Sequence, residues 1–283
     1  MQISPRMQVL PLTGALGAEV HGVDLKALEK NAWNELHQAF LRYSVLAIRE
    51  QKLEPADLMN IGARFGEPCH YPFVTGMDGY PFIFEVVKEP AETKNFGGAW
   101  HSDTAYLKQP PLATLLHAVE TPSHGGDTLF CNTAAAYDAL SEGMKKTLEG
   151  LVGVNSAELK HAGGRTSQHA KIKGMKVHGT ESADQYVAEH PVVRTHPDTG
   201  RKALYASRSH TTHFRGMTEE ESAPILGFLF QHQTKPEFTC RVRWAPGTLT
   251  VWDNRCTQHN AVNDYHGQRR HMRRLTVGAQ TPC

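Results

Sequence analysis

The chain has 283 residues, of which 40% are hydrophobic and 21% are charged, so it can bury a sizeable core and intrinsic disorder is excluded as its overall state. Thirty Lys and Arg residues oppose 29 Asp and Glu residues, and a formal net charge of +1 argues against nucleic acid as a partner, because nucleic-acid-binding proteins usually carry a basic excess. No segment approaches the roughly 18 consecutive apolar residues of a membrane span, and the first 25 residues lack the apolar region of a signal peptide, so we expect no membrane partner.

The cysteines predict a reducing environment. They are odd in number, scattered and without Cys-x-x-Cys pairing, which argues against a disulfide framework and favours a cytoplasmic location. The five are Cys69, Cys131, Cys240, Cys256 and Cys283.

Helical and strand-like segments alternate along the chain. Residues 31–42 place apolar side chains on one helical face, residues 45–48 read as a buried strand, and residues 54–65 form a second amphipathic helix that Gly66 ends. Short apolar runs punctuated by Pro and Gly follow, as is typical of sandwiches and jelly rolls rather than doubly wound sheets. These runs are 82–87, 113–119, 203–205, 239–244 and 249–252.

Two further helices are predicted in the second half. Residues 134–148 have helical periodicity. Thr218 and Glu221 have the spacing of a capping box, but Pro224 falls inside the helix that would follow, so a start near Ser222 stays open. Together with the short strands, these segments predict a mostly β fold with flanking helices.

Residues 160–184 differ from the rest, because they are rich in Gly, Lys and His and poor in apolar residues. A solvated surface loop is the simpler interpretation. Loops of this length are uncommon unless they are mobile or functional, so a lid over a binding site is the alternative.

A His-x-Asp motif, His101-Ser102-Asp103, can supply two neighbouring ligands of one metal ion, because on a strand both side chains point to the same face. A distant second His would complete a facial triad that leaves coordination positions open. The motif alone is weak, since roughly two such pairs are expected by chance in this composition. The other copy, His196-Pro197-Asp198, continues into Thr-Gly and reads as a turn.

The last third of the chain contains further candidates. If the basic run 269–274 is a strand, Arg270, Met272 and Arg274 share one face, although a solvated basic edge is the commoner role of such a run. Cys256 and His259 form Cys-x-x-His, but no second Cys pair exists to complete a zinc site.

The chain resembles the taurine dioxygenase and chlorophenoxyacetate dioxygenase family of iron(II)- and 2-oxoglutarate-dependent oxygenases, from about residue 10 to residue 279. The stretches that carry the resemblance are WHSDTAYLKQPPLATLLHAVETPSHGGDTLF, AAYDALS, HPVVRTHPDTGRKALY, FLFQHQTKPEF and VWDNRCTQHNAVNDYHGQRRHMRR. It implies a single domain over residues 1–283, a distorted double-stranded β-helix (a cupin-like jelly roll), with Fe(II) as cofactor and 2-oxoglutarate and O2 as co-substrates.

The resemblance also assigns roles to residues. It implies that His101, Asp103 and His259 bind iron, and that Arg270, eleven residues past His259, grips the distal carboxylate of 2-oxoglutarate with help from Thr128. A planar guanidinium suits this task, because it can pair with a carboxylate through two parallel hydrogen bonds.

For the substrate, the resemblance points to Arg274, four residues beyond Arg270, as the residue that meets an anionic group. Thr104 and Tyr71 are expected to border the substrate. The stretch before the metal motif, Phe96-Gly97-Gly98, departs from the taurine enzyme, and residues 160–184 show no detailed match.

We therefore expect an enzyme that hydroxylates a small anionic molecule of the aryloxyalkanoate, sulfonate or sulfate ester class, with release of succinate and CO2. Taurine dioxygenase proper, or a cupin-type metalloenzyme that does not use 2-oxoglutarate, is the alternative. Members of the family are often dimers or tetramers, so a homo-oligomer is expected.

Overall fold

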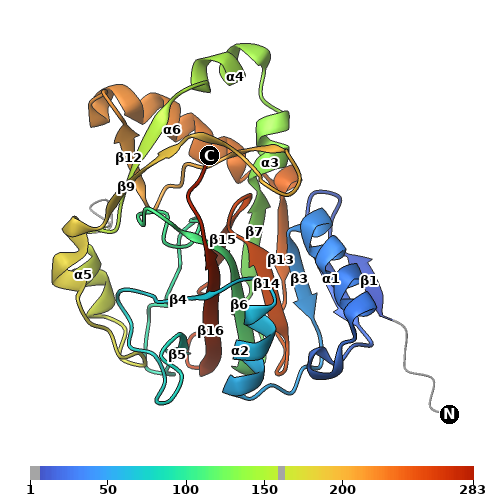
Figure 1. Cartoon of the computed structure of the whole chain (residues 1–283). Helices are drawn as coiled ribbons and strands as arrows, with labels where there is room; N and C mark the ends of the chain where they lie inside the picture. The colour runs from blue at the N-terminus through green and yellow to red at the C-terminus, as the bar shows by residue number, and fades with distance from the viewer. Residues whose placement is uncertain (1–6, 159–162) are drawn as a thin grey trace.

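The computed structural model describes residues 7–158 and 163–283 (Figure 1). Its main sheet has eight strands in the order β1-β2-β3-β14-β6-β16-β4, with β5 also paired to β16. These strands are β1 (Gln8–Pro11), β2 (Ala18–His21), β3 (Val45–Ile48), β4 (Pro68–Cys69), β5 (Ile83–Lys88), β6 (Pro111–Glu120), β14 (Leu249–Asp253) and β16 (Arg270–Ala279).

A second sheet of three antiparallel strands faces the main one, in the order β13-β7-β15, and the two form the jelly roll. Its strands are β7 (Thr128–Asn132), β13 (Thr239–Val242) and β15 (Thr257–Ala261). Two smaller sheets pair β8 (Val152–Ser156) with β9 (Val187–Pro191) and β12 (Thr211–Phe214), and β10 (Val193–Thr195) with β11 (Lys202–Leu204).

Helices cover the outside of the sheets (Figure 1). The α-helices are α1 (Lys30–Tyr43), α2 (Pro55–Ala63), α3 (Thr133–Asp138), α4 (Glu142–Leu148), α5 (Arg165–His169) and α6 (Glu219–Gln233); the 3-10 helices are η1 (Leu25–Ala27), η3 (Thr180–Gln185) and η4 (Pro236–Phe238). A bilayer crossing needs about 20 apolar residues in one helix, and none of the helices in the described part of the chain meets that requirement.

The middle of the main sheet is buried on both faces. Along β3, Leu46 and Ile48 pack with the helices α1 and α2, while Val45 and Ala47 pack with residues of the second sheet such as Phe130. Because strand side chains alternate between faces, this continuous apolar run serves two separate cores.

The fold predicted from the sequence is confirmed, and the predicted strands and the first two helices lie where expected, within three residues at each end. The segment 134–148 is a correction: it is two helices, because Ser141 accepts a hydrogen bond from Met144 N and so starts a new helix. The alternative start near Ser222 is also wrong. The Thr218–Glu221 capping box is formed in both directions, and Pro224 is accommodated inside α6.

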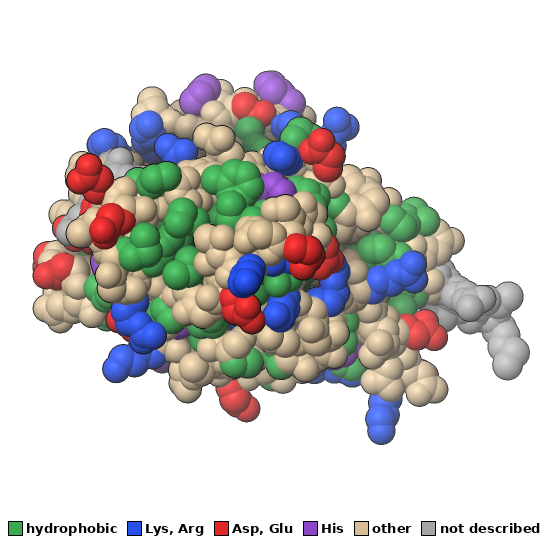
Figure 2. Space-filling view, turned by 90° about the horizontal axis from the view of Figure 1, so that it is seen from above, with side chains coloured by type: hydrophobic (Ala, Val, Ile, Leu, Met, Phe, Trp, Pro, Cys, Tyr) green, Lys and Arg blue, Asp and Glu red, His purple; other side chains and the backbone are tan. Residues whose placement is uncertain are grey.

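The surface seen from above carries both hydrophobic and charged side chains (Figure 2). Figure 2 shows hydrophobic side chains gathered near its middle, with charged side chains of both signs around them. The exposed hydrophobic residues of the chain include Phe228 on α6, which is 42% exposed.

Candidate active site

The structure brings His101, Asp103 and His259 together. Asp103 Oδ1 lies 3.6 Å from His101 Nε2 and 3.7 Å from His259 Nε2, and the three potential ligand atoms lie within 4.8 Å of one another. All three side chains are largely buried. Two imidazoles and one carboxylate at this spacing form the donor set of a facial triad, which a divalent iron ion can accept.

The backbone aligns the two histidines. His101 N donates to His259 O at 3.1 Å, and His259 N donates to His101 O at 2.9 Å. This single β-bridge holds the two histidines side by side. The expectation that the whole motif lies on a strand is only partly correct, because the chain turns after His101. Thr104, in that turn, has the left-handed φ of 45°, which is strained for a branched side chain.

The Asp103 carboxylate is oriented by its neighbours. Oδ2 accepts a hydrogen bond from Thr114 Oγ1 at 2.6 Å, and Asn254 Nδ2 donates in turn to that hydroxyl at 2.9 Å. Oδ1, turned toward the two imidazoles, is in ion-pair contact with Arg274 Nη2. Burial alone would raise the pKa of the Asp103 carboxyl, but Arg274, followed by His259 and His101, holds it well below its usual range.

The imidazoles present the right atoms to a metal. His101 Nδ1 donates to Ala99 O at 2.6 Å, which leaves the lone pair of Nε2 for a ligand. Burial, and next the neighbouring His101, hold the pKa of His259 well below its usual value, so its imidazole is neutral. Its Nδ1 atom is buried without a hydrogen-bond partner among the described residues.

A cavity of about 320 Å³ opens beside this cluster. His101, Asp103 and three residues expected to border the substrate, Tyr71, Thr104 and Arg274, line it. The remaining lining residues are Lys94, Asn95, Phe96, Gly97, Gly98, Ala99, Tyr106, Arg165, Gln168, His169, Ile172, Ser209, His210 and Asn263.

The three expected substrate residues differ in their contacts. The Thr104 hydroxyl is buried without a partner in the described part of the chain. The Arg274 guanidinium lies over the Tyr71 ring, 5.7 Å from its centroid, and neither its Nε nor its Nη2 makes a hydrogen bond of good geometry, although Nη2 contacts Asp103. The adjacent His70 stacks on Phe82 instead and does not line the cavity.

Arg270 and Thr128 lie outside the lining of this cavity, but a third residue connects them. Trp244 Nε1 donates to Thr128 Oγ1 at 3.1 Å, and the Arg270 guanidinium lies 5.4 Å from the centre of the Trp244 ring. Arg270 is only 5% exposed, and its Nε and Nη2 atoms have no hydrogen-bond partner among the described residues. That edge of the guanidinium is the one that can hold a carboxylate through two bonds.

The predicted alternation along β16 is confirmed. Arg270, Met272 and Arg274 are buried on one face, whereas Arg269 points away and pairs with Glu89 and Glu120. The basic run is therefore not a solvated edge, because β16 lies inside the main sheet between β5 and β6.

Several site residues carry no sequence signal. Trp244, Thr114 and Asn254 are ordinary strand or turn residues, and only long-range pairing brings them to the site. Arg165 and His169 belong to the segment 160–184, whose residues 160–162 lie outside the described part of the chain. From residue 163 on, the segment contains the short helices α5 and η3 with non-helical residues between them, and the side chains of Arg165 and His169 are buried.

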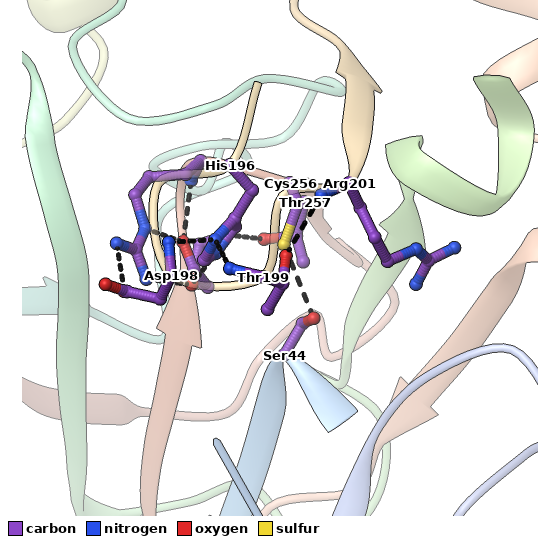
Figure 3. A network of polar contacts seen from close by, with 9 residues as sticks. Ser44, His196, Asp198, Thr199, Arg201, Cys256 and Thr257 are labelled. Atoms are coloured by element: carbon purple, nitrogen blue, oxygen red, sulfur yellow. Dashed lines mark hydrogen bonds and ion pairs between the residues drawn. The ribbon is translucent and has the colours of Figure 1, made fainter. Parts of the chain in front are cut away.

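A second His/Asp cluster lies elsewhere in the roll (Figure 3). His196, Asp253 and Cys256 could also reach one ion by distance alone. Asp253, however, accepts hydrogen bonds from Arg255 through both carboxylate oxygens, at 2.8 and 2.7 Å, and from His196 Nε2 at 2.9 Å. Cys256 Sγ contacts Ser44 Oγ, and among the described residues Cys256 and His259 belong to different groups of potential metal ligands.

Known proteins are similar to this chain over nearly its whole length. Residues 8–276 match the family described as "Taurine catabolism dioxygenase TauD, TfdA family". An alkylsulfatase of Acinetobacter baylyi is 34% identical over 97% of this chain and 86% of its own, and an alpha-ketoglutarate-dependent sulfate ester dioxygenase of Pseudomonas putida is 33% identical over 98% and 91%. The crystal structure of a taurine dioxygenase from Burkholderia xenovorans superposes with a TM-score of 0.82 at 33% identity, over 98% of this chain and 91% of that one.

Proposed function

This chain belongs to the TauD, TfdA family, and on that premise we propose that His101, Asp103 and His259 hold its iron and that Arg274 binds the anionic group of its substrate. The protein is an Fe(II)- and 2-oxoglutarate-dependent dioxygenase that hydroxylates an anionic substrate and releases succinate and CO2. Bound iron, with 2-oxoglutarate and O2, supplies the oxidation of an unactivated C–H bond. The observation that carries the residue assignment is the meeting of the three ligand side chains beside one cavity, whose wall includes His101 and Asp103.

The donor set fits ferrous iron. Two imidazole nitrogens and one carboxylate oxygen on one side of an ion leave the other side for 2-oxoglutarate and O2. Thr114 and the Ala99 carbonyl fix the carboxylate and one imidazole, as the outer partners of metal ligands usually do.

Arg270 fits the distal carboxylate of 2-oxoglutarate. Its buried, unpartnered Nε and Nη2 atoms need an anion, since a buried cation without a partner is unfavourable. The Thr128 hydroxyl, which accepts a hydrogen bond from Trp244 Nε1, can donate its own hydrogen to the same carboxylate. A cupin-type metalloenzyme without 2-oxoglutarate would have no use for this pair.

The substrate class follows from Arg274 and from the relatives. A guanidinium in the cavity wall favours an anion, and two relatives carry names that refer to sulfate esters or alkyl sulfates. We place sulfate esters first, with sulfonates, including taurine, and aryloxyalkanoates after them. Hydroxylation at a carbon next to the ester oxygen would give a product that breaks down to a carbonyl compound and sulfate.

Four further expectations stay proposals. One domain spans the chain, and residues 160–184 form a lid, which the burial of Arg165 and His169 against the cavity supports. A cytoplasmic location agrees with five free cysteines. A homo-oligomer is proposed as well.

A substrate panel tests the proposed function. Succinate formation would be measured with Fe(II), 2-oxoglutarate and alkyl sulfates, sulfonates, aryloxyalkanoates and their uncharged or cationic analogues. We expect only anions to increase succinate formation, so coupling of the uncharged or cationic compounds alone would contradict the role of Arg274.

A matched pair of arginine variants tests the 2-oxoglutarate site. Arg270→Ala should raise the KM for 2-oxoglutarate roughly 10- to 100-fold, since hydrogen bonds to charged groups contribute about 1.5–3 kcal/mol, and should leave iron binding intact. Arg269→Ala, at the residue just before β16 that pairs with Glu89, is the control. Loss of iron and 2-oxoglutarate binding together would mean that Arg270 is misassigned.

A further inference from the structure

The helix α5 places an arginine and a histidine in the wall of the cavity. Arg165 is 4% exposed and His169 is 6% exposed, and both line the same space as Arg274. Neither residue takes part in the assignment of iron, 2-oxoglutarate or the substrate's anionic group given above.

Arg165 is held rigidly. Its Nε donates to Ala157 O at 2.5 Å and its Nη1 donates to Tyr71 Oη at 3.4 Å, while the guanidinium lies 4.4 Å from the centre of the Phe73 ring. The same Nη1 lies 3.3 Å from His169 Nε2. Arg165 therefore fixes the imidazole rather than serving as a free cation.

This contact determines the hydrogen on the imidazole. A guanidinium can only donate, so His169 Nε2 accepts and, in the neutral ring, Nδ1 carries the proton. Burial, and next the charge of Arg165, lower the pKa of His169 to about 4, so the ring is neutral near pH 7. Nδ1 is buried and has no hydrogen-bond partner among the described residues.

We propose that the Nδ1–H of His169, fixed by Arg165, donates a hydrogen bond to the oxygen that joins the substrate's anionic group to its carbon chain. The inference rests on the proposed function, because it takes this cavity as the substrate site. Arg274, which lies over the Tyr71 ring, already offers a charged partner for the anionic group. The neutral N–H group of His169, whose ring contacts that of Phe96, is a single donor and suits a single uncharged oxygen. His169 is thus a specificity-determining residue that separates sulfate esters from sulfonates.

The test compares substrates that differ only in that oxygen. The pair consists of an alkyl sulfate and the alkanesulfonate in which a methylene replaces the ester oxygen. The wild-type protein should favour the oxygen-containing member by about tenfold or more in kcat/KM, because a site built around a donor rejects an analogue that leaves the donor unpaired.

Two substitutions separate donation to the substrate from support of Arg165. His169→Asn keeps an amide donor near the Nδ1 position, whereas His169→Gln keeps an acceptor near the Nε2 position for Arg165. We expect the preference to persist in part in His169→Asn and to vanish in His169→Gln, with the KM for 2-oxoglutarate unchanged in both. Lys171→Ala, an exposed cation that does not line the cavity, is the control.

The outcomes distinguish this inference from the proposed function. Turnover of anions with no preference in the wild-type protein, or a preference that survives in His169→Gln, would overturn the role of His169 alone. Absence of turnover with every anion would overturn the proposed function as well. Calorimetry under anaerobic conditions gives the ratio of the dissociation constants for the alkyl sulfate and the sulfonate, which measures the preference independently of catalysis. It therefore also tests a variant that binds substrate but does not turn it over.

Discussion

Two buried clusters in this protein each join a histidine, an aspartate and a third potential metal ligand within reach of one ion. At the first, Asp103 Oδ1 has one cationic neighbour, Arg274, and His101 and Asp103 line a cavity. At the second, both oxygens of Asp253 are engaged by Arg255, and His196 donates to it as well.

The other atoms of the second cluster are also engaged. His196 Nδ1 accepts hydrogen bonds from the backbone of Asp198 and Thr199 (Figure 3). Burial raises the pKa of the Cys256 thiol to about 12, so it is protonated and a poor ligand. Similar side chains thus make an ion pair in one place and a candidate metal site in the other. The difference lies in whether lone pairs remain available beside open space.

The largest effect is expected at Asp103. Asp103→Ala should reduce iron affinity and lower substrate-dependent succinate formation by about 10³-fold or more, because metal-ion catalysis contributes several kcal/mol and each 1.36 kcal/mol is a factor of ten. Iron titration and a succinate assay measure the two effects. Normal iron binding in this variant would place the metal elsewhere.

Substitution of Asp253 should reduce the stability of the protein and leave iron binding unchanged. Asp253→Asn leaves the buried Arg255 without its full counter-charge and should lower the free energy of unfolding by about 3–5 kcal/mol. Urea denaturation measures this loss, and the folded variant should bind iron with unchanged stoichiometry. A stable variant with lost iron binding would reverse the roles of the two clusters.

The free energy of unfolding should also depend on pH through the Asp253–Arg255 ion pair. Burial would raise the pKa of Asp253, but Arg255 and then His196 lower it to about 2 from an ordinary value of 3.8. The ion pair therefore contributes stability above about pH 4 that is lost as the pH falls toward 2, roughly 2 kcal/mol in all. The difference in the free energy of unfolding between wild type and Asp253→Asn, measured by urea denaturation, should decrease from pH 6 to pH 2. A constant difference would contradict the lowered pKa of Asp253.

The smallest effect is expected at Thr114. Thr114→Val removes the hydrogen bond to Asp103 Oδ2 and should weaken iron binding about tenfold, the lower end of what such outer partners contribute. Thermal unfolding should be less affected than in Asp253→Asn. Thr250→Val, at the neighbouring buried threonine of β14 whose hydroxyl has no partner among the described residues, is the control.

Much of this architecture follows from local pattern. The apolar run at β3 and the alternating Arg and Met of β16 predict which side chains are buried, because the strand period is fixed at two residues. The break between α3 and α4 was missed, since Ser141 acts as a cap only when the chain turns there. The helix α5 was missed as well, because its buried residues are polar and give no apolar period.

By itself, the sequence determined the kinds of donor available, the faces of the strands and, through its resemblance to a family, the reaction. Tertiary structure decided which His-x-Asp pair meets a second histidine: His101 does, through a β-bridge to His259, whereas His196 lies in a turn beside Asp253. It also decided where Arg165 and His169 lie. The physical reason is that a lone pair becomes available or engaged through partners far away in the chain, which no local spacing records.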